Sequence, residues 1–169
     1  MNKQHVHIIK TGGTIEFHDP AYEEMNSKLM KFDSTIESYL NNLINPLFDF
    51  SIVNLLQKDS RDITDQDRER LVQEINSSTH TNIIITHGTF TMTTTGSFLK
   101  NKISDKKIIL VGSMIPLSGF AISDAGFNLG FAIGSFASIE NGVYIATQGS
   151  LLDPDNAHKN VDDLKFEVN

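Results

Sequence analysis

The stretch Val6-His7-Ile8-Ile9-Lys10-Thr11-Gly12-Gly13-Thr14, residues 6–14, runs from an apolar segment into a pair of glycines flanked by threonines. The apolar first half is typical of a buried strand, and the glycine pair is typical of the turn that ends one. Open α/β sheets bind their ligands beyond the carboxyl ends of the strands. Residues 6–14 therefore predict a first strand that ends at a ligand site.

The same pattern recurs along the chain. Further strand-like runs occur at residues 50–56, 83–85, 107–112 and 143–146, and a polar tail follows the last of them. Helical segments are expected between them, one after the capping signal that begins at Thr64 and one with apolar residues at helical spacing from Ile122 to Phe136. Apolar strands that alternate with helices predict an α/β fold with a doubly wound, mostly parallel sheet and helices on both faces.

Composition limits what the chain can be. Its 169 residues fit one domain, so we expect residues 1–169 to fold as a single domain. The 14 basic and 21 acidic residues give a formal net charge of -7, which argues against a nucleic-acid partner. No stretch is long enough to span a membrane, and the absence of cysteine fits a reducing compartment, so we expect a cytoplasmic protein with no membrane partner.

Small hydroxyl and glycine residues follow each of the first four strand-like runs. They are Thr11 to Thr14, Ser60, Thr86 to Thr89, and Gly112 with Ser113. In a doubly wound sheet these positions lie along one edge, so their hydroxyl and backbone N–H groups are expected to converge on one crevice. The alternative is that each of these residues only makes a turn or a helix cap, since threonine and glycine are preferred there.

Two of these segments carry a resemblance to a known family. Thr11-Gly12-Gly13-Thr14-Ile15 and Thr86-His87-Gly88-Thr89 resemble the two threonine signatures of the bacterial-type L-asparaginase/glutaminase family. Residues 111–116 with 123–129 are similar to a later segment of that family, and residues 142–169 resemble its last strand and the start of its interdomain linker. The resemblance covers the amino-terminal domain only, and we expect the smaller carboxyl-terminal domain of the family to be absent.

The resemblance implies roles for particular residues. Thr14 takes the place of the nucleophilic threonine, and Thr89 that of the second catalytic threonine. Lys106, just before the strand-like run at 107–112, takes the place of the lysine that helps to deprotonate a hydroxyl. Ser60 takes the place of the residue that binds the α-carboxylate of the substrate, and Tyr22 lies where the family has a flexible lid with a catalytic tyrosine.

Other candidate residues follow from these assignments. Gly13 and Gly88 have no side chain and would let a substrate approach the backbone closely. Arg61 stands where the family has a small or amide side chain, and its guanidinium would either bind a carboxylate through two hydrogen bonds or face solvent. Phe90 stands where the family has an aspartate that pairs with the lysine and receives the α-ammonium group of the substrate.

Two functions remain open at this point. The first is an amidohydrolase that releases ammonia from L-asparagine or a related small amide, whose α-amino group is absent or differently recognised. The second is a catalytically degenerate ligand-binding or regulatory domain, which Phe90 favours. A nucleotide-binding module is less favoured because the chain has neither G-x-G-x-x-G spacing nor a P-loop lysine after Gly13.

The sequence also bears on cofactors and on assembly. The six histidines show no specific metal-ligand spacing, so we expect no metal and no cofactor. The only other partner expected is the small amide itself. Because the family assembles into dimers and tetramers, the resemblance implies a homodimer or a higher homo-oligomer.

Overall fold

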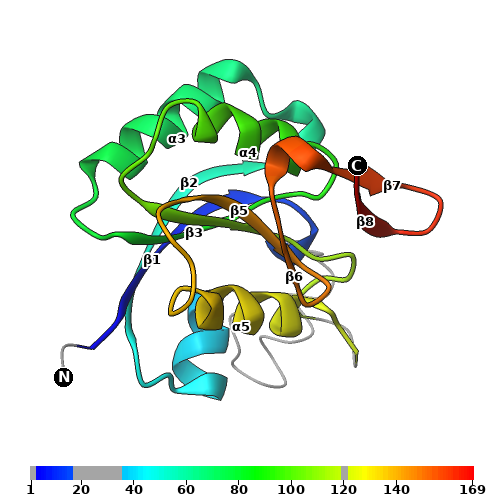
Figure 1. The fold of residues 1–169 in the computed structure, drawn as a ribbon. Coiled ribbons are helices and arrows are strands. Elements are labelled where there is room, and N and C mark those ends of the chain that lie inside the picture. Colours follow the sequence, from blue (N-terminus) through cyan, green and yellow to red (C-terminus); the bar gives the residue numbers. More distant parts are fainter. Residues whose placement is uncertain (1–2, 17–35, 119–121) are drawn as a thin grey trace.

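The computed structural model describes residues 3–16, 36–118 and 122–169 (Figure 1). A six-stranded sheet in the order β2-β1-β3-β4-β5-β6 forms its centre. The strands are β1 (His5–Gly12), β2 (Asp49–Lys58), β3 (Asn82–Thr86), β4 (Lys107–Val111), β5 (Gly142–Thr147) and β6 (Ser150–Leu152). All neighbours up to β5 are parallel, and β6 pairs with β5 in the antiparallel direction. This arrangement confirms the predicted mostly parallel sheet.

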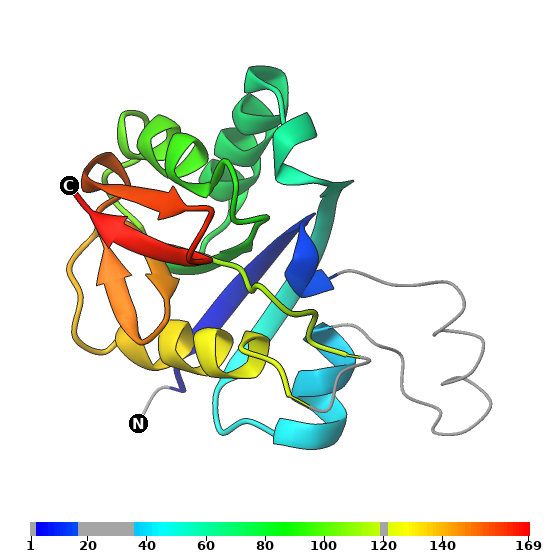
Figure 2. The ribbon, with the colours of Figure 1, turned by 90° about the vertical axis from the view of Figure 1, so that its right-hand side faces the viewer.

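Helices cover both faces of the sheet, as Figures 1 and 2 show. Helices α3 (Asp65–Ser77) and α4 (Met92–Lys100) pack on one face. On the other face lie α5 (Ala125–Ser135) and the short α2 (Ile36–Ser38), which continues as a π-helical segment at Tyr39–Ile44. The fold is therefore doubly wound, as the alternation of apolar strands and helices predicts.

Each central strand contributes to two separate cores. Neighbouring residues of a strand point to opposite faces of the sheet. Accordingly Ile8 and Ile84 pack in the core beneath α2 and α5, whereas Ile9 and Ile85 pack in the core beneath α3 and α4. All four side chains are fully buried. This two-sided burial explains why the strands read as continuous apolar runs in the sequence.

The capping signal at Thr64 forms as predicted. The Thr64 hydroxyl accepts a hydrogen bond from the Asp67 backbone N–H, and the Asp67 carboxylate accepts one from the Thr64 backbone N–H. Lys58 at the end of β2 donates to the same carboxylate over 2.7 Å. These contacts connect the end of β2 to the start of α3, and they hold the connecting 3-10 turn Ser60–Asp62 between them.

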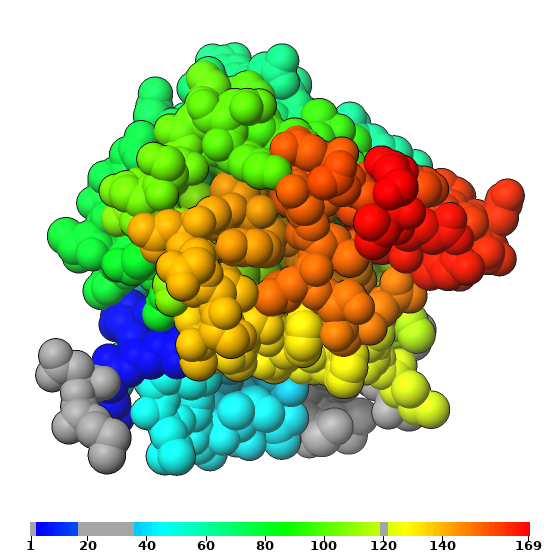
Figure 3. Space-filling view, viewed as in Figure 1, coloured from blue at the N-terminus to red at the C-terminus, as the bar shows by residue number. Residues whose placement is uncertain are grey.

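The polar tail expected after residue 146 is instead ordered structure. After β6, a 3-10 turn at Pro154–Asn156 leads into an antiparallel hairpin of β7 (Ala157–Asn160) and β8 (Lys165–Val168). The hairpin stands at one side of the body and is coloured red in Figure 3. Its strands have little apolar character because they form a two-stranded sheet of their own outside the central one. Composition alone therefore suggested a tail.

The strand order places a topological switch point at the carboxyl ends of β1 and β3, which is where open α/β sheets have their ligand crevice. The chain leaves β1 toward the face covered by α2, whereas it leaves β3 toward the face covered by α4. Neighbouring strands whose connections diverge in this way leave an opening between them, and ligands bind at such switch points in open α/β sheets. The two threonine-containing segments of the sequence begin at this point.

At this switch point the backbones of Gly13 and Gly88 are in contact. A Cβ atom built on Gly13 would lie 2.3 Å from the Gly88 nitrogen and 2.5 Å from the Gly88 Cα atom. Gly13 also has a φ of 80°, a backbone conformation that strains residues with side chains. The ends of β1 and β3 can therefore approach this closely only because residue 13 is glycine, whereas the missing side chain of Gly88 makes room for Ser60.

In the part of the chain that the structure describes, no helix is both long and apolar enough to cross a membrane.

We expect Gly13→Ala to destabilise the fold by about 2 kcal/mol or more, because the new methyl group meets backbone atoms that cannot rotate away. The matched control is Gly130→Ala on α5, where an added Cβ meets no atom within 4 Å. That change should stabilise the helix by roughly 0.5–1 kcal/mol. Urea unfolding of both variants measures the difference, and equal effects would contradict the packing described for Gly13.

Candidate active site

Thr14 and Thr89 lie just beyond the carboxyl ends of β1 and β3. Thr14 begins the 3-10 turn Thr14–Glu16 directly after β1, and Thr89 follows the end of β3 by three residues. The glycines that precede them, Gly13 and Gly88, are in backbone contact. A Cβ on Gly112, at the end of β4, would lie 3.2 Å from the Thr89 Cγ2 atom. The structure thus brings the ends of three strands together around these hydroxyl residues.

The Thr89 hydroxyl has a lysine as its close partner. The Lys159 Nζ atom lies 2.7 Å from the Thr89 Oγ1 atom and donates a hydrogen bond to it. On another side, the Thr89 hydroxyl points toward the Met114 sulfur at 3.9 Å, which is a weak acceptor. Lys159 lies on β7, so the hairpin of β7 and β8 supplies the amine of this site.

The prediction that Lys106 lies at this site is wrong. Its Nζ atom donates to the backbone carbonyls of Ser78 and His80, at 2.8 and 3.1 Å. Lys106 directly precedes β4, whereas Thr89 follows the adjacent parallel strand β3. The two residues are therefore at opposite edges of the sheet. Sequence reasoning missed Lys159 because it lies in a stretch that reads as a polar tail.

The environment of Lys159 favours its neutral form. Burial lowers the pKa of the Lys159 amine, and the positive charge of Arg61 lowers this pKa further. Among the described residues, Lys159 makes no ion pair with a carboxylate that would oppose these effects. An amine with a lowered pKa is a better proton acceptor near neutral pH.

A buried ion pair supports the turn that carries Thr14. The Glu16 carboxylate lies 3.3 Å from the Lys10 Nζ atom, and both side chains are almost fully buried. Glu16 also accepts a hydrogen bond from the Thr86 hydroxyl, and the Thr11 hydroxyl donates to the Thr86 carbonyl over 2.6 Å. Burial raises the pKa of Glu16, and its hydrogen bond with Thr86 partly opposes this rise. Sequence reasoning did not single out Lys10 or Glu16, because neither has a distinctive spacing.

His87 fixes the peptide that precedes Thr89. Its Nδ1 atom lies 2.8 Å from the Gly88 carbonyl oxygen and its Nε2 atom 2.9 Å from the Thr95 hydroxyl. Because a carbonyl can only accept, Nδ1 carries the proton and Nε2 accepts from Thr95. Burial lowers the pKa of His87 to about 4, so the ring is neutral at pH 7.

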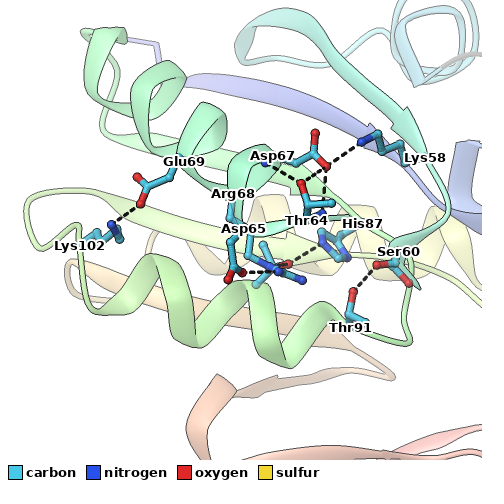
Figure 4. Close-up of polar contacts among 11 residues, drawn as sticks. Lys58, Ser60, Thr64, Asp65, Asp67, Arg68, Glu69, His87, Thr91 and Lys102 are labelled. Atoms are coloured by element: carbon cyan, nitrogen blue, oxygen red, sulfur yellow. Dashed lines mark hydrogen bonds and ion pairs between the residues drawn. The ribbon is translucent and has the colours of Figure 1, made fainter. Parts of the chain in front are cut away.

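The same network continues to the surface of α3. Arg68 donates to the Thr95 hydroxyl over 3.1 Å and pairs with Asp65 over 2.7 Å. Figure 4 shows this chain of contacts from Asp65 through Arg68 to His87. The side chain of Arg68 is 7% exposed, so the network is held inside the protein. Its last link is the Gly88 carbonyl, and it therefore sets the orientation of the backbone next to Thr89.

Ser60 packs against Gly88. A Cβ on Gly88 would be 2.7 Å from the Ser60 Oγ atom. The Ser60 carbonyl accepts a hydrogen bond from the Thr91 hydroxyl over 2.6 Å, as Figure 4 shows. The Ser60 hydroxyl is buried and has no hydrogen-bond partner among the described residues. The structure therefore brings Ser60, Gly13 and Gly88 together.

Arg61 and Phe90 form the outer rim of the site. The Arg61 guanidinium donates two hydrogen bonds of 2.9 Å to the Asp59 carboxylate. It also lies over the Phe90 ring, as does the Lys159 ammonium group. Tyr22, which the sequence placed in a lid, lies outside the described residues. Within the described ranges, no three His, Cys, Asp or Glu side chains are arranged to hold a metal ion.

Comparison with known proteins agrees with this geometry. The family model "Asparaginase, N-terminal" matches residues 5–163. The glutaminase-asparaginase of Acinetobacter glutaminasificans is 31% identical over 146 residues, which cover 82% of this chain and 43% of that protein.

Solved structures show the same likeness. The probable cytoplasmic L-asparaginase from Campylobacter jejuni matches with a TM-score of 0.78 and 30% identity, over 98% of this chain and 53% of that one. L-asparaginase I from Vibrio cholerae matches with a TM-score of 0.74 and 26% identity, over 98% of this chain and 51% of that one. The chain thus spans about half the length of the relatives that it matches.

We expect a pH effect on stability from His87. Its pKa is about 4 when folded, against roughly 6.5 in an unfolded chain. Between these values the unfolded state binds a proton that the folded state does not, so stability falls as the pH falls. Between pH 7 and pH 4 the wild type should lose about 3 kcal/mol more than His87→Gln, which has no imidazole. Urea unfolding at both pH values measures this, and parallel losses would contradict the buried neutral ring.

Proposed function

The chain belongs to the asparaginase family through its N-terminal domain, and on this basis we propose that it is an amidohydrolase. In this proposal Thr14 attacks the carbon of a small amide, L-asparagine or a related compound, and ammonia is released. The observation that carries the proposal is the 2.7 Å hydrogen bond between Lys159 and Thr89, beside the glycine contact that joins Thr14 to the same crevice.

A threonine hydroxyl needs a base before it can attack an amide carbon. In our proposal neutral Lys159 accepts the Thr89 hydroxyl proton, and the Thr89 oxygen in turn accepts the proton of the Thr14 hydroxyl. The lowered pKa of Lys159 supports this role, because more of the amine is then neutral at a given pH. Lys159 thereby takes the role that the resemblance had assigned to Lys106.

The reaction proceeds in two steps. The Thr14 oxygen forms a bond to the amide carbon, the carbon–nitrogen bond breaks, and the nitrogen leaves as ammonia with the proton that Lys159 had accepted. Water then attacks the resulting ester, and its proton passes to the Thr14 oxygen as the acid is released. Backbone N–H groups beside the two threonines would stabilise the negative oxygen that forms in each step.

The alternative is a ligand-binding or regulatory domain that has lost catalysis. The observation behind it is Phe90, which stands where the resemblance predicts an aspartate. A binding domain would keep its fold and its ligand affinity without the Thr14 hydroxyl. An enzyme would lose turnover.

We also propose a cellular location and an oligomeric state for the chain. The Campylobacter jejuni relative is described as a probable cytoplasmic L-asparaginase, and we propose the cytoplasm for this chain as well. A homodimer or higher homo-oligomer would close the crevice against water, which strengthens the electrostatic interactions inside it.

Loss of each proposed group should reduce ammonia release from L-asparagine, L-glutamine and their des-amino analogues. We expect Thr14→Ala, Thr89→Val and Lys159→Met each to lower kcat by about 10²–10⁴. The matched control is Lys106→Met, which removes a lysine at the opposite edge of the sheet and should retain the wild-type rate. Full activity in Thr14→Ala would contradict the nucleophile. No turnover in the wild type would favour the binding domain.

The pH profile of kcat should report the base. Because Lys159 acts as the neutral amine, kcat should rise with pH and level off below the ordinary lysine pKa of roughly 10.4. The Arg61 charge lowers the pKa of Lys159, so Arg61→Gln should move the rising limb to higher pH. Arg70→Gln on α3 is the control cation and should leave the limb in place. An unmoved limb in Arg61→Gln would contradict the assignment.

A further inference from the structure

Phe90 lies between two nitrogen-bearing side chains from distant parts of the chain, Arg61 and Lys159. The Lys159 Nζ atom is 4.0 Å and the Arg61 Cζ atom 4.8 Å from the centroid of its ring. Both separations allow attraction between a cation and the negative face of an aromatic ring. The ring is 46% exposed, so it forms part of the surface that an entering ligand meets. That surface therefore combines an aromatic ring with the Arg61 guanidinium and the Lys159 amine.

Two described carboxylates of the site, Asp59 and Glu16, already have partners. Asp59 accepts two hydrogen bonds from the Arg61 guanidinium, and this contact lowers the pKa of Asp59 to about 2. Glu16 is paired with Lys10 beneath the Thr14 turn. An ammonium group of a ligand that lies on the Phe90 ring would be close to the Arg61 guanidinium, which lies over the same ring. The two positive charges would repel each other.

The Ser60 hydroxyl indicates what kind of group is bound instead. Ser60 is 1% exposed, and its hydroxyl has no hydrogen-bond partner among the described residues. An unpaired buried hydroxyl costs free energy, which a ligand oxygen can recover by accepting its hydrogen bond. Arg61 is the next residue in the chain, and its exposed guanidinium offers further donors. A ligand carboxylate could accept hydrogen bonds from both the Ser60 hydroxyl and the Arg61 guanidinium.

We propose that this rim selects ω-monoamides of dicarboxylic acids that lack an α-ammonium group, with Phe90 as the specificity-determining residue. The proposal rests on the amidohydrolase function proposed above. The ligand carboxylate binds Ser60 and Arg61, the methylene groups pack on the Phe90 ring, and the amide carbon reaches the threonines. Succinamate is the simplest such compound, and it differs from L-asparagine only by the missing ammonium group.

The test compares kcat/KM for succinamate and L-asparagine. The wild type should prefer succinamate by about tenfold or more, which corresponds to one unpaired charge contact of about 1.4 kcal/mol. Phe90→Asp places a carboxylate between Arg61 and Lys159, and it should shift the preference toward L-asparagine. The matched control Phe90→Leu removes the ring without adding charge and should keep the order of the wild type. A wild type that prefers L-asparagine, or Phe90→Leu shifting as Phe90→Asp does, would overturn the proposal.

Binding of the two reaction products, succinate and L-aspartate, tests ligand selection at the rim independently of turnover. Isothermal titration of the wild type with succinate and with L-aspartate measures ligand choice without turnover. If neither amide is hydrolysed, the amidohydrolase proposal fails, while tighter binding of succinate still supports the selection described for the rim. L-Aspartate binding that equals or exceeds succinate binding, or no binding of either, would overturn the rim proposal whatever the turnover shows.

Discussion

Backbone contact between Gly13 and Gly88 is the constraint on which the crevice depends. Parallel strands that meet at a switch point end at the same edge of the sheet, where ligands bind. With no side chain at Gly13, the turns after β1 and β3 touch. Thr14 and Thr89 are then carried by adjoining turns, and Ser60 packs against Gly88 from the end of β2. The carboxyl ends of β1, β2 and β3 thus lie in contact with one another.

Buried polar networks hold these turns in place from beneath. Glu16 and Lys10 support the turn that carries Thr14, and His87 orients the peptide before Thr89. Each network contains a group whose pKa burial has moved, upward for Glu16 and downward for His87. Such groups are costly unless their partners are fixed, so the networks make the loops at the carboxyl edge more rigid than their composition suggests.

The charge of the site comes from a segment outside the central sheet. Lys159 reaches Thr89 from the β7–β8 hairpin, and Phe90 lies between this lysine and Arg61. A lysine that pairs with no described carboxylate and lies beside a threonine hydroxyl suits proton transfer. An aromatic ring beside the Arg61 guanidinium suits an anionic ligand. The chemistry proposed for the chain therefore depends on how the hairpin folds back over the sheet.

The sequence by itself determined the doubly wound sheet, both glycine–threonine turns and the cap at Thr64, because apolar periodicity and turn residues act over a few positions. Only the tertiary structure decided which lysine meets Thr89. Lys106 precedes a strand and must lie at the amino edge, whereas Lys159 reaches the site across 70 residues of chain. The contacts of Ser60 with Gly88 and of Phe90 with Lys159 were equally hidden, since contacts between distant segments depend on the packing of the whole fold and leave no local pattern.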